Sequence, residues 1–528
     1  MLKQKTNFMK TKHQIYTALL LLGANLFQPK LTSAQDGSLD LTFNTTGKVQ
    51  SSIGTNDDDA KAIALQADGK IVVAGHSFIG GHYYFAVQRY NSDGSIDNSF
   101  DTDGSVVTLI EDNSKASAVA IQSDGKIIAA GFNTSGPIGS FTLVRYKSNG
   151  SLDSSFGSNG IVTTLVGTGS SGILSLGVQS DGKIVAAGYA MVGTYNDFAV
   201  ARYNSNGSLD NTFSSDGITT IDFGAKSDIA YGMKIQTDNK IVVCGYAKMS
   251  AENDFAVARL LSDGNLDNSF DTDGKLTTKI TGSFDEYASC VDIDADNKII
   301  VGGYTNNSFF DYVVVRYNSD GSVDNSFDLD GIAVVDYGTG TDIGQAIGLK
   351  VQSDKKIILV GLTQSGADNN FAVIKFKING TLDSTFDSDG MTTTAINNKD
   401  VANAVAIQTD GKILAAGGTY AGVQNKIALL RYNNTITSSS SIAGLAAHTN
   451  QYSIYPNPST STCFLKSFKP LNNAEIICYN ILGQKVWSLS QVNGEQVQFN
   501  NSQLPKGQYT VKVIEQGLEI TTLKMLIK

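Results

Sequence analysis

Three short motifs recur seven times, always in the same order, along most of this chain of 528 residues. The first is D/N-G-x-hydrophobic-D-x-x-F, whose last residues lie 56 to 59 positions apart: Phe43, Phe100, Phe156, Phe213, Phe270, Phe327 and Phe386. The second is Asp followed by Gly, Asn or Lys and then Lys-Ile, and the third is an apolar run that ends near a basic residue. A constant period of this kind is typical of a repeat architecture, in which one supersecondary unit is stacked many times.

Each unit contains four segments with the composition of β-strands, which we call strands a, b, c and d. In the second unit they are Ala118–Gln122, Lys126–Gly131, Phe141–Tyr146 and Ile161–Val166. They are short, rich in β-branched and aromatic residues, and bounded by Gly, Asn or Asp, which favour turns. Strand b is almost continuously apolar, as expected for a strand buried on both faces. No helical periodicity of useful length interrupts the strands, so the region is predicted to be all-β.

Four strands in each of seven units predict a seven-bladed β-propeller over residues 35–432. In this fold, blades of four-stranded sheet surround a channel. Stacking of the blades buries both faces of each sheet, and closure of the ring leaves no long exposed edge. The alternative is an open β-solenoid, whose rungs are usually much shorter and lack hairpin turns such as Ser123–Gly125.

The two ends of the repeat array are complementary. The N-terminal piece supplies a lone strand d, residues 48–53, before the first strand a. The last unit has strands a, b and c and then continues into a Ser/Thr-rich linker, residues 433–450. We therefore predict that residues 48–53 complete the last blade and close the ring without a covalent link.

Charged residues follow the same period. Every strand c carries one basic residue: Arg89, Arg145, Arg202, Arg259, Arg316, Lys375 and Arg431. Every loop between strands c and d carries one aspartate: Asp40, Asp97, Asp153, Asp210, Asp267, Asp324 and Asp383. We expect one structural ion pair per blade, with Arg431 paired to Asp40 across the closure. Such pairs specify register more reliably than they add stability.

Residues 1–34 have the organisation of a signal peptide. Four lysines precede an apolar run from Ile15 to Phe27, which is shorter than the roughly 20 residues of a membrane-spanning helix. Small residues at 32–34 predict cleavage after Ala34, although an uncleaved anchor also fits the pattern. The net charge of −10 offers neither a basic footprint for nucleic acid nor a polybasic patch for membranes. We expect an exported, soluble monomer.

The four cysteines do not form a disulfide framework. Cys244 and Cys290 lie in apolar strands and are expected to be small buried residues. Cys463 and Cys478 lie in neighbouring predicted strands near the C-terminus, and export would permit a bridge between them. Both the bridged and the free state are compatible with the sequence.

Motifs for metal or catalytic chemistry are weak. The loop Asp97–Gly104 is rich in carboxylates, but it lacks the EF-hand order of ligands, and other copies lose the acids. Asx-type turns with Gly at positive φ explain the motif better than calcium does. The predicted mature chain keeps only His76, His82 and His448 as histidines, and no nucleophile, zinc or phosphate-binding motif is present. We expect no cofactor, no metal and no assigned catalytic residue.

The seven units differ mainly at one end of the predicted propeller. The a–b turns and c–d loops are nearly identical in all copies, whereas the b–c and d–a loops vary in sequence. In a four-stranded meander the b–c and d–a loops emerge on the same face. Because binding residues concentrate on loops held by a rigid scaffold, we predict a ligand surface there that includes Tyr83, Tyr84, Tyr195 and Phe310. Simple drift of tolerant loops is the alternative.

The segments Gln122–Ile127, Phe198–Tyr203 and Asn206–Phe213 resemble the delta-sixty repeat. That resemblance covers about residues 36–432 and implies a β-propeller in an exported bacterial protein. The family has no known activity, so the resemblance implies no catalytic residues.

Residues 451–528 resemble the type A C-terminal sorting domain of the type IX secretion system of Bacteroidota. The motifs are Tyr455-Pro-Asn-Pro458, Gly483-Gln-Lys-Val486 and Leu504-Pro-Lys-Gly-Gln-Tyr509. The segment is predicted to form about seven short strands in a small Ig-like β-sandwich. The resemblance implies transport across the outer membrane by the type IX machinery, and either anchoring at the surface or release.

The function expected from the sequence is that of an exported binding or adhesion module with a glycan or a protein as ligand. The alternative is an extracellular enzyme that acts on polysaccharide through carboxylates of the same variable face. Binding without turnover would favour the first interpretation, and product release abolished by one Asp or Glu substitution would favour the second.

Overall fold

The computed structural model describes two stretches of the chain. The first is residues 34–436, except 136–137, 225, 250, 281, 283, 307–309, 337–342 and 366–367. The second is residues 452–527, except 456–461, 481–483, 501–503 and 516–517. The predicted signal peptide up to residue 33 and most of the predicted linker lie outside them. The described chain divides into two compact units between Thr437 and Ser438.

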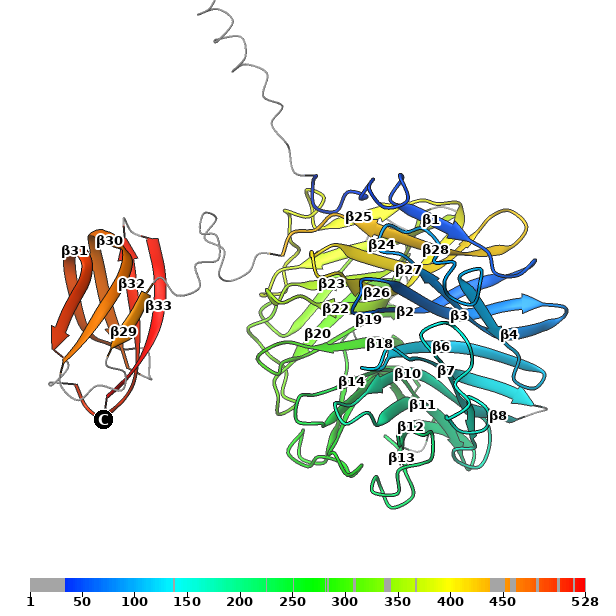
Figure 1. Ribbon diagram of the computed structural model, residues 1–528. Coiled ribbons are helices and arrows are strands. Elements are labelled where there is room, and N and C mark those ends of the chain that lie inside the picture. The colour runs from blue at the N-terminus through cyan, green and yellow to red at the C-terminus, as the bar shows by residue number, and fades with distance from the viewer. Residues whose placement is uncertain are drawn as a thin grey trace, which may run out of the picture. The chain divides into compact units, whose positions relative to one another are not determined.

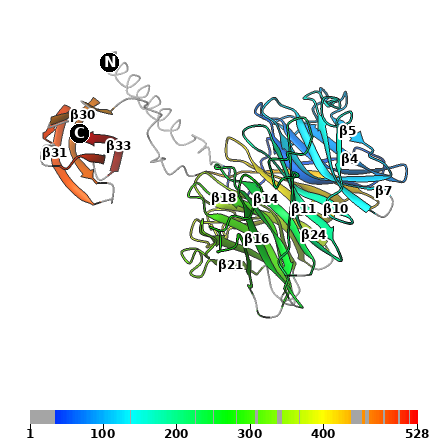
Figure 2. The same cartoon turned by 90° about the horizontal axis from the view of Figure 1, so that it is seen from below.

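The first unit consists of seven antiparallel sheets of four strands each, which confirms the predicted seven-bladed β-propeller. Figures 1 and 2 show the blades following one another in chain order from blue to yellow. Blades 1 to 3 are β2 (Asp58–Leu65), β3 (Ile71–Ile79), β4 (His82–Tyr90) and β5 (Ser105–Thr108); β6 (Asn113–Ile121), β7 (Ile127–Ser135), β8 (Ile138–Tyr146) and β9 (Ile161–Thr164); and β10 (Ser171–Val178), β11 (Ile184–Val192), β12 (Tyr195–Tyr203) and β13 (Ile218–Ile221).

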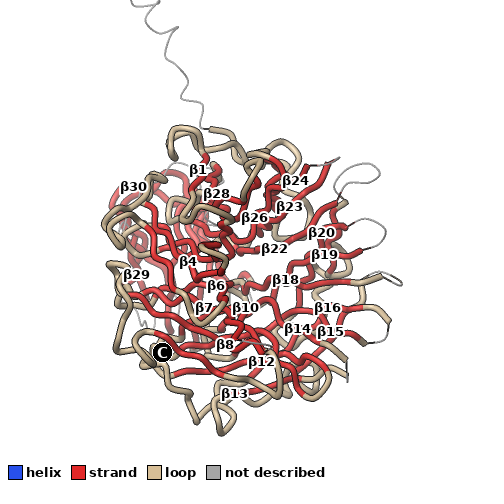
Figure 3. Tube along the Cα trace, turned by 90° about the vertical axis from the view of Figure 1, so that its right-hand side faces the viewer, coloured by secondary structure: helices blue, strands red, loops and turns tan. Residues whose placement is uncertain are grey.

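Blades 4 to 7 repeat the same order of strands. They are β14 (Asp228–Ile235), β15 (Ile241–Lys248), β16 (Asn253–Leu260) and β17 (Lys275–Thr278); β18 (Glu286–Ile293), β19 (Ile299–Asn306), β20 (Phe310–Tyr317) and β21 (Ile332–Val335); β22 (Ile343–Val351), β23 (Ile357–Ser365), β24 (Asp368–Phe376) and β25 (Met391–Thr394); and β26 (Asn398–Ile407), β27 (Ile413–Tyr420), β28 (Asn425–Tyr432) and β1 (Lys48–Ser51). Figure 3 shows the first strand of a blade nearest the middle of the ring, as in the succession β18, β19, β20.

The last blade takes its outer strand from the N-terminal end of the chain. Strand β1 pairs antiparallel with β28, from Lys48 opposite Leu430 to Ser51 opposite Ile427, and Figure 1 shows the blue strand beside β28. The strand is shorter than the predicted span of residues 48–53. It ends early because the backbone N–H of Ile53 donates to Asp58 Oδ2 at 2.9 Å instead of continuing the ladder.

Hydrophobic cores fill the spaces between neighbouring blades. Strands b and c are buried along most of their length, and the Phe that ends each first motif has no exposed surface. One such core joins Val72 and Phe85 of blade 1 to Ile127 and Val144 of blade 2. Another joins blade 7 to blade 1, so packing continues across the closure.

The strands b and c extend further than the sequence indicates. The residues assigned to variable b–c loops belong mostly to the strands themselves, which meet in tight turns such as Gly80-Gly81 between β3 and β4. Both glycines have positive φ, which glycine adopts without steric cost. Side chains near these hairpins are therefore held by the ladder rather than by free loops.

The described residues of the second unit form five strands: β29 (Tyr452–Tyr455), β30 (Thr462–Tyr479), β31 (Lys485–Asn500), β32 (Gly507–Glu515) and β33 (Leu518–Ile527). The described residues of this unit thus form fewer and longer strands than the seven short ones predicted. Strands β30 and β31 are long and stay paired through several register shifts, while β30 pairs with β29 near its start and with β32 near its end. Cys463 and Cys478 are buried in this core and are not joined by a disulfide.

Candidate ligand-binding cavity

A β-bulge occurs at the same place in the innermost strand of every blade. In blade 1, Ala60 pairs with Gly75 and Ala62 with Ala74, so Lys61 has no partner in the ladder. The seven skipped residues are Lys61, Ser117, Leu174, Tyr231, Ser289, Ile347 and Asn403. A bulge can re-aim the side chain of the extra residue, and all seven of these residues line one cavity.

The bulge requires glycine at the facing position of strand b. A Cβ on Gly75 would lie 1.9 Å from the carbonyl oxygen of Asp59. Equivalent contacts of 1.8–2.0 Å occur in the other blades, at Gly131, Gly188, Gly245, Gly303, Gly361 and Gly417. Two backbones meet at these points and leave no room for a side chain. The backbone geometry of the bulge is thus the same in all seven blades, while the side chain of the bulged residue differs between most of them.

The cavity lies in the channel, toward the end where the strands a begin. Its volume is about 650 Å³, within the roughly 300–1,000 Å³ that is usual for small-molecule sites. Besides the bulged residues, it is lined by neighbours on strands a and b, such as Asp59, His76 and Tyr287. It therefore lies on the face where the repeats differ most, and every blade contributes to it.

Charged groups of the cavity gather on blades 1 and 2. Lys61 Nζ lies 2.7 Å from Asp59 Oδ2, and Asn403 Nδ2 donates to Asp59 Oδ1 at 3.2 Å. The ammonium group of Lys115 lies over the ring of Tyr83, 3.7 Å from its centroid. Among the described residues, no carboxylate forms an ion pair with Lys115.

Burial sets the protonation of these groups. Burial and the nearby Lys115 and Lys61 lower the pKa of His76 to about 3, so its imidazole is neutral at pH 7. Burial raises the pKa of the Asp59 carboxyl, although Lys61 opposes this shift. Burial and Lys61 lower the pKa of Lys115.

Aromatic rings gather across the channel, on blades 4 and 5. The rings of Tyr231, Tyr246, Tyr287, Tyr304 and Phe310 form a chain of contacts with successive centroid distances of 6.1, 5.2, 5.1 and 5.5 Å. Tyr287 and Tyr304 are stacked, with an interplanar angle of 29°. Tyr231, Tyr287 and Tyr304 line the cavity. Burial, with Tyr231 and Tyr287 nearby, raises the pKa of Tyr246 to about 12.

The structure separates the four aromatic residues predicted to bind ligand. Tyr83 contacts His76 edge-on at 5.3 Å between ring centroids and supports Lys115, and Phe310 ends the aromatic chain on blade 5. Tyr84 pairs in the ladder with Ser77, and Tyr195 is an exposed residue beside a hairpin turn. None of the four lines the cavity directly. Their role in binding stays a prediction.

The predicted acid–base pairs lie at the other end of the propeller. Arg Nε to Asp Oδ2 distances are 2.7–2.9 Å for Arg89–Asp97, Arg145–Asp153, Arg202–Asp210, Arg259–Asp267, Arg316–Asp324 and Arg431–Asp40. In the blade with lysine, Lys375 Nζ is 3.9 Å from Asp383 and donates to Asn434 Oδ1 at 2.6 Å. All of these basic and acidic side chains are buried.

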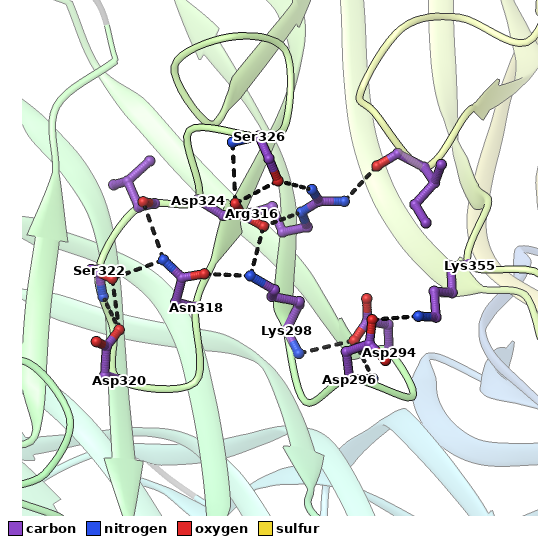
Figure 4. A network of polar contacts seen from close by, with 12 residues as sticks. Asp294, Asp296, Lys298, Arg316, Asn318, Asp320, Ser322, Asp324, Ser326 and Lys355 are labelled. Carbon is purple, nitrogen blue, oxygen red and sulfur yellow. Dashed lines mark hydrogen bonds and ion pairs between the residues drawn. The ribbon is translucent and has the colours of Figure 1, made fainter. Parts of the chain in front are cut away.

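A further lysine joins each of these pairs, as Figure 4 shows for blade 5. There Lys298 Nζ lies 3.0 Å from Asp324 Oδ2, Ser326 Oγ donates to Asp324 Oδ1 at 2.7 Å, and Arg316 donates to the carbonyl oxygen of Ile378 in the next blade. The sequence analysis assigns this lysine no role, because it lies far along the chain from the aspartate that it contacts. The motif residues Lys, Arg, Asp and Ser or Thr thus form one contact that links adjacent blades.

Hydrogen bonding lowers the pKa of these aspartates. Burial alone would raise the pKa of Asp40, but hydrogen bonds from Lys412 and Thr42 and the charge of Arg431 lower it to about 2. Asp153 behaves alike, with a pKa of about 2, through Ser155, Arg145 and Lys126. These carboxylates are ionised at pH 7, and they are engaged in ion pairs and hydrogen bonds within the propeller.

Three carboxylates meet between blades 3 and 4. Oxygens of Asp197, Asp222 and Asp228 lie within 4.8 Å of one another. Asp228 accepts the backbone N–H of Phe223 at 2.8 Å, and so fixes the start of β14. Burial, with Asp222 and Asp228 nearby, raises the pKa of Asp197 to about 6. The cluster does not line the described cavity.

The fold and its C-terminal unit define an exported β-propeller protein. Seven segments match the model of the domain of unknown function (DUF5122) beta-propeller: residues 66–100, 122–156, 179–213, 236–270, 295–327, 352–386 and 408–435. Residues 453–528 match the secretion system C-terminal sorting domain. The chain is thus a DUF5122 β-propeller protein with a sorting domain, and type IX secretion carries it to the cell surface or the extracellular space. No curated protein matches the sequence.

Several solved structures are similar to the chain. A fungal alcohol oxidase of the AA5 family in complex with copper has 12% identity and a TM-score of 0.40, over 91% of this chain and 98% of the other. PorZ, a surface component of the type IX secretion system of Porphyromonas gingivalis, has 8% identity and a TM-score of 0.30, over 88% and 74%. A PL25 ulvan lyase has 12% identity and a TM-score of 0.45, over 73% and 96%. Because every TM-score is below 0.5, none of their activities transfers to this chain.

Within the described residues, no helix is long and apolar enough to cross a membrane.

The three sorting-domain motifs lie only partly within the described residues. Pro456–Pro458 and Gly483 lie outside the described residues, whereas Tyr509 of the last motif is buried and its hydroxyl donates to the carbonyl oxygen of Pro505 at 2.6 Å.

Proposed function

We propose that the protein is an extracellular binding module whose ligand enters the cavity of the propeller channel. The observation that carries this proposal is the ring of bulged residues. One backbone geometry, repeated seven times, directs side chains of different chemistry into a single space of about 650 Å³. A scaffold that is constant in backbone and variable in the residues it presents is typical of a recognition site.

The opposite end of the propeller differs from the cavity in a way that supports this assignment. Its charged residues recur in nearly every blade and are occupied by contacts within the molecule, as at Arg316, Asp324 and Lys298. The cavity instead holds partly exposed tyrosines and a lysine without a carboxylate partner among the described residues. Export through the signal peptide of residues 1–34 and the sorting domain would present this cavity outside the cell.

The test is binding of the full chain to a glycan array and to a set of extracellular polysaccharides. Tyr231→Ala removes an aromatic ring from the cavity, and Leu329→Ala alters a side chain that is 93% exposed at a c–d loop. We expect the first variant to lose glycan binding and the second to bind like the wild type. Equal binding by Tyr231→Ala and the wild type would contradict the proposal.

A second candidate function, hydrolysis or elimination on a polysaccharide, has one specific observation in its favour. Asp59 is a carboxyl with a raised pKa in the same cavity as the neutral imidazole of His76. A carboxyl with a raised pKa is suited to proton transfer. Release of reducing ends from a bound polysaccharide, abolished in Asp59→Asn while binding remains, would establish this activity in place of simple binding.

A further inference from the structure

We infer that the cavity binds an acidic saccharide, with its carboxylate or sulfate group at Lys115 and Lys61 and its sugar ring against Tyr231 and Tyr287. This inference rests on the proposed binding function and adds the class of ligand. Two opposite walls of the cavity, one cationic and one aromatic, support it.

The cationic wall has more positive charge than its own residues neutralise. Lys61 and Lys115 both line the cavity, and Asp59 is the one carboxylate among the described lining residues. Asp59 is already paired with Lys61 at 2.7 Å. His76, which is near both lysines, carries no charge at pH 7 because its pKa is about 3. The wall therefore has one ammonium group available to an anion.

Lys115 is also held in position before any ligand arrives. Its ammonium group lies 3.7 Å from the centroid of the Tyr83 ring, an attractive cation–π arrangement. A positioned, partly desolvated cation binds an anion more strongly than a mobile surface lysine, since less side-chain entropy is lost. The same positive charge disfavours a metal cation in this part of the cavity.

The aromatic wall lies across the channel, because blades 4 and 5 stand opposite blades 1 and 2 in a ring of seven. Tyr231 is 38% exposed, and its ring begins the chain of contacts that continues through Tyr246 to Tyr287. Aromatic faces carry negative electrostatic potential and attract the polarised C–H groups of a sugar ring. Burial raises the pKa of Tyr231 and Tyr287, so their hydroxyls stay neutral and do not repel an anion.

A ligand that uses both walls must combine an anionic substituent with a ring that has C–H faces. A neutral sugar would use the tyrosines but leave Lys115 without a counter-charge. A simple anion would use Lys115 but leave the aromatic wall empty. An acidic saccharide satisfies both, and a cavity of about 650 Å³ accommodates a short saccharide segment.

The experiment measures binding of the full chain by isothermal titration to matched oligosaccharide pairs. One pair is oligogalacturonate and its carboxyl-reduced form, and the other is a sulfated galactan oligosaccharide and its desulfated form. We expect the acidic member of at least one pair to bind about tenfold more tightly than its neutral counterpart. The pair that shows the difference identifies the anionic group as carboxylate or sulfate.

Variants locate the effect in the cavity. Lys115→Met keeps an apolar stem over Tyr83 and removes the charge, so it should weaken binding of the acidic member about tenfold and leave the neutral member unchanged. Lys115→Arg should restore most of the affinity. Lys147→Met, an exposed lysine of a c–d turn, is the matched control and should change neither. Unaltered thermal unfolding of Lys115→Met would show that the loss is not caused by misfolding.

The outcomes separate this inference from the proposed function. Equal affinity for acidic and neutral members, or equal binding by Lys115→Met, would overturn the acidic ligand and leave a glycan-binding module. Absence of binding to all four oligosaccharides, together with a blank glycan array, would overturn both.

Discussion

Arg431 Nε donates to Asp40 Oδ2 at 2.8 Å, although 391 residues separate the two in the chain. The contact has the same geometry as the Arg–Asp pairs within the other blades, but here it joins the two ends of the propeller. Arg431 also donates to the carbonyl oxygen of Ser92 in blade 1. One side chain thus connects the N-terminal segment, blade 7 and blade 1, and closure depends on it as well as on strand β1.

Removal of Asp40 should therefore destabilise the whole ring. Asp40→Ala leaves the buried guanidinium of Arg431 without its carboxylate, and breaking one partner of a buried pair costs about 3–5 kcal/mol. We expect the free energy of unfolding in urea to fall by about this amount. Deletion of residues 35–55, which also removes β1, should abolish most of the cooperative transition.

Asp112→Ala provides the comparison, because Asp112 is exposed and a surface change of this kind usually alters stability by less than about 0.5 kcal/mol. A deletion of 35–55 that melts like the wild type would show that the ring does not need its N-terminal strand.

The same aspartates predict how stability depends on pH. The folded-state pKa of Asp40 and Asp153 is about 2, below the value of about 3.9 expected in the unfolded chain. Between these values the unfolded state binds more protons than the folded state, so the contribution of the pairs is present above about pH 4 and is lost as pH falls toward about 2. Urea unfolding at a series of pH values from 5 to about 2 measures the slope, since stability tracks proton binding.

Asp40→Asn should have a shallower slope over this interval than the wild type, because the amide does not titrate. Parallel slopes for the two proteins would mean that the low pKa of Asp40 does not contribute to acid unfolding.

How much of this architecture can be predicted from sequence depends on whether the signal is periodic. The spacing of Phe43, Phe100 and their equivalents is enough to predict the number of blades. Each strand c has one basic residue and each c–d loop has one Asp, and this pattern is enough to predict that Arg431 pairs with Asp40. The bulge leaves only an indirect trace, the glycine near the end of each strand b. It consists of a one-residue shift in register, which depends on pairing with strand b, and Tyr231 reads as an ordinary strand residue.

The sequence shows a glycine at the end of predicted strand b in every unit. It does not show why glycine is needed there, which is the close approach of two backbones at the bulge. Gly131→Ala should therefore disturb both stability and the cavity. Its Cβ would lie 1.9 Å from the carbonyl oxygen of Lys115, and overpacking of this kind costs about 1–3 kcal/mol or more. Gly282→Ala is the control, because nothing lies within 4 Å of its added Cβ.

Thermal unfolding and glycan affinity of these two variants give independent measurements of the same geometry. Gly131→Ala should lower the melting temperature and weaken binding, while Gly282→Ala should leave both close to wild type. A fully stable Gly131→Ala variant would contradict the assignment of a close backbone contact at the bulge.

The two thiols of the sorting domain should be unreactive in the folded chain. Cys463 and Cys478 are buried in its core, and burial, with Cys463 close by, raises the pKa of Cys478 to about 11. Because the thiolate is the reactive form, neither thiol should react with a disulfide reagent at pH 7.5 while the chain is folded. In urea all four cysteines of the chain should react. A count of two thiols in urea, restored to four by a reductant, would show that one pair of cysteines is bridged. A fast-reacting thiol of this unit in the native chain would contradict the core described for it.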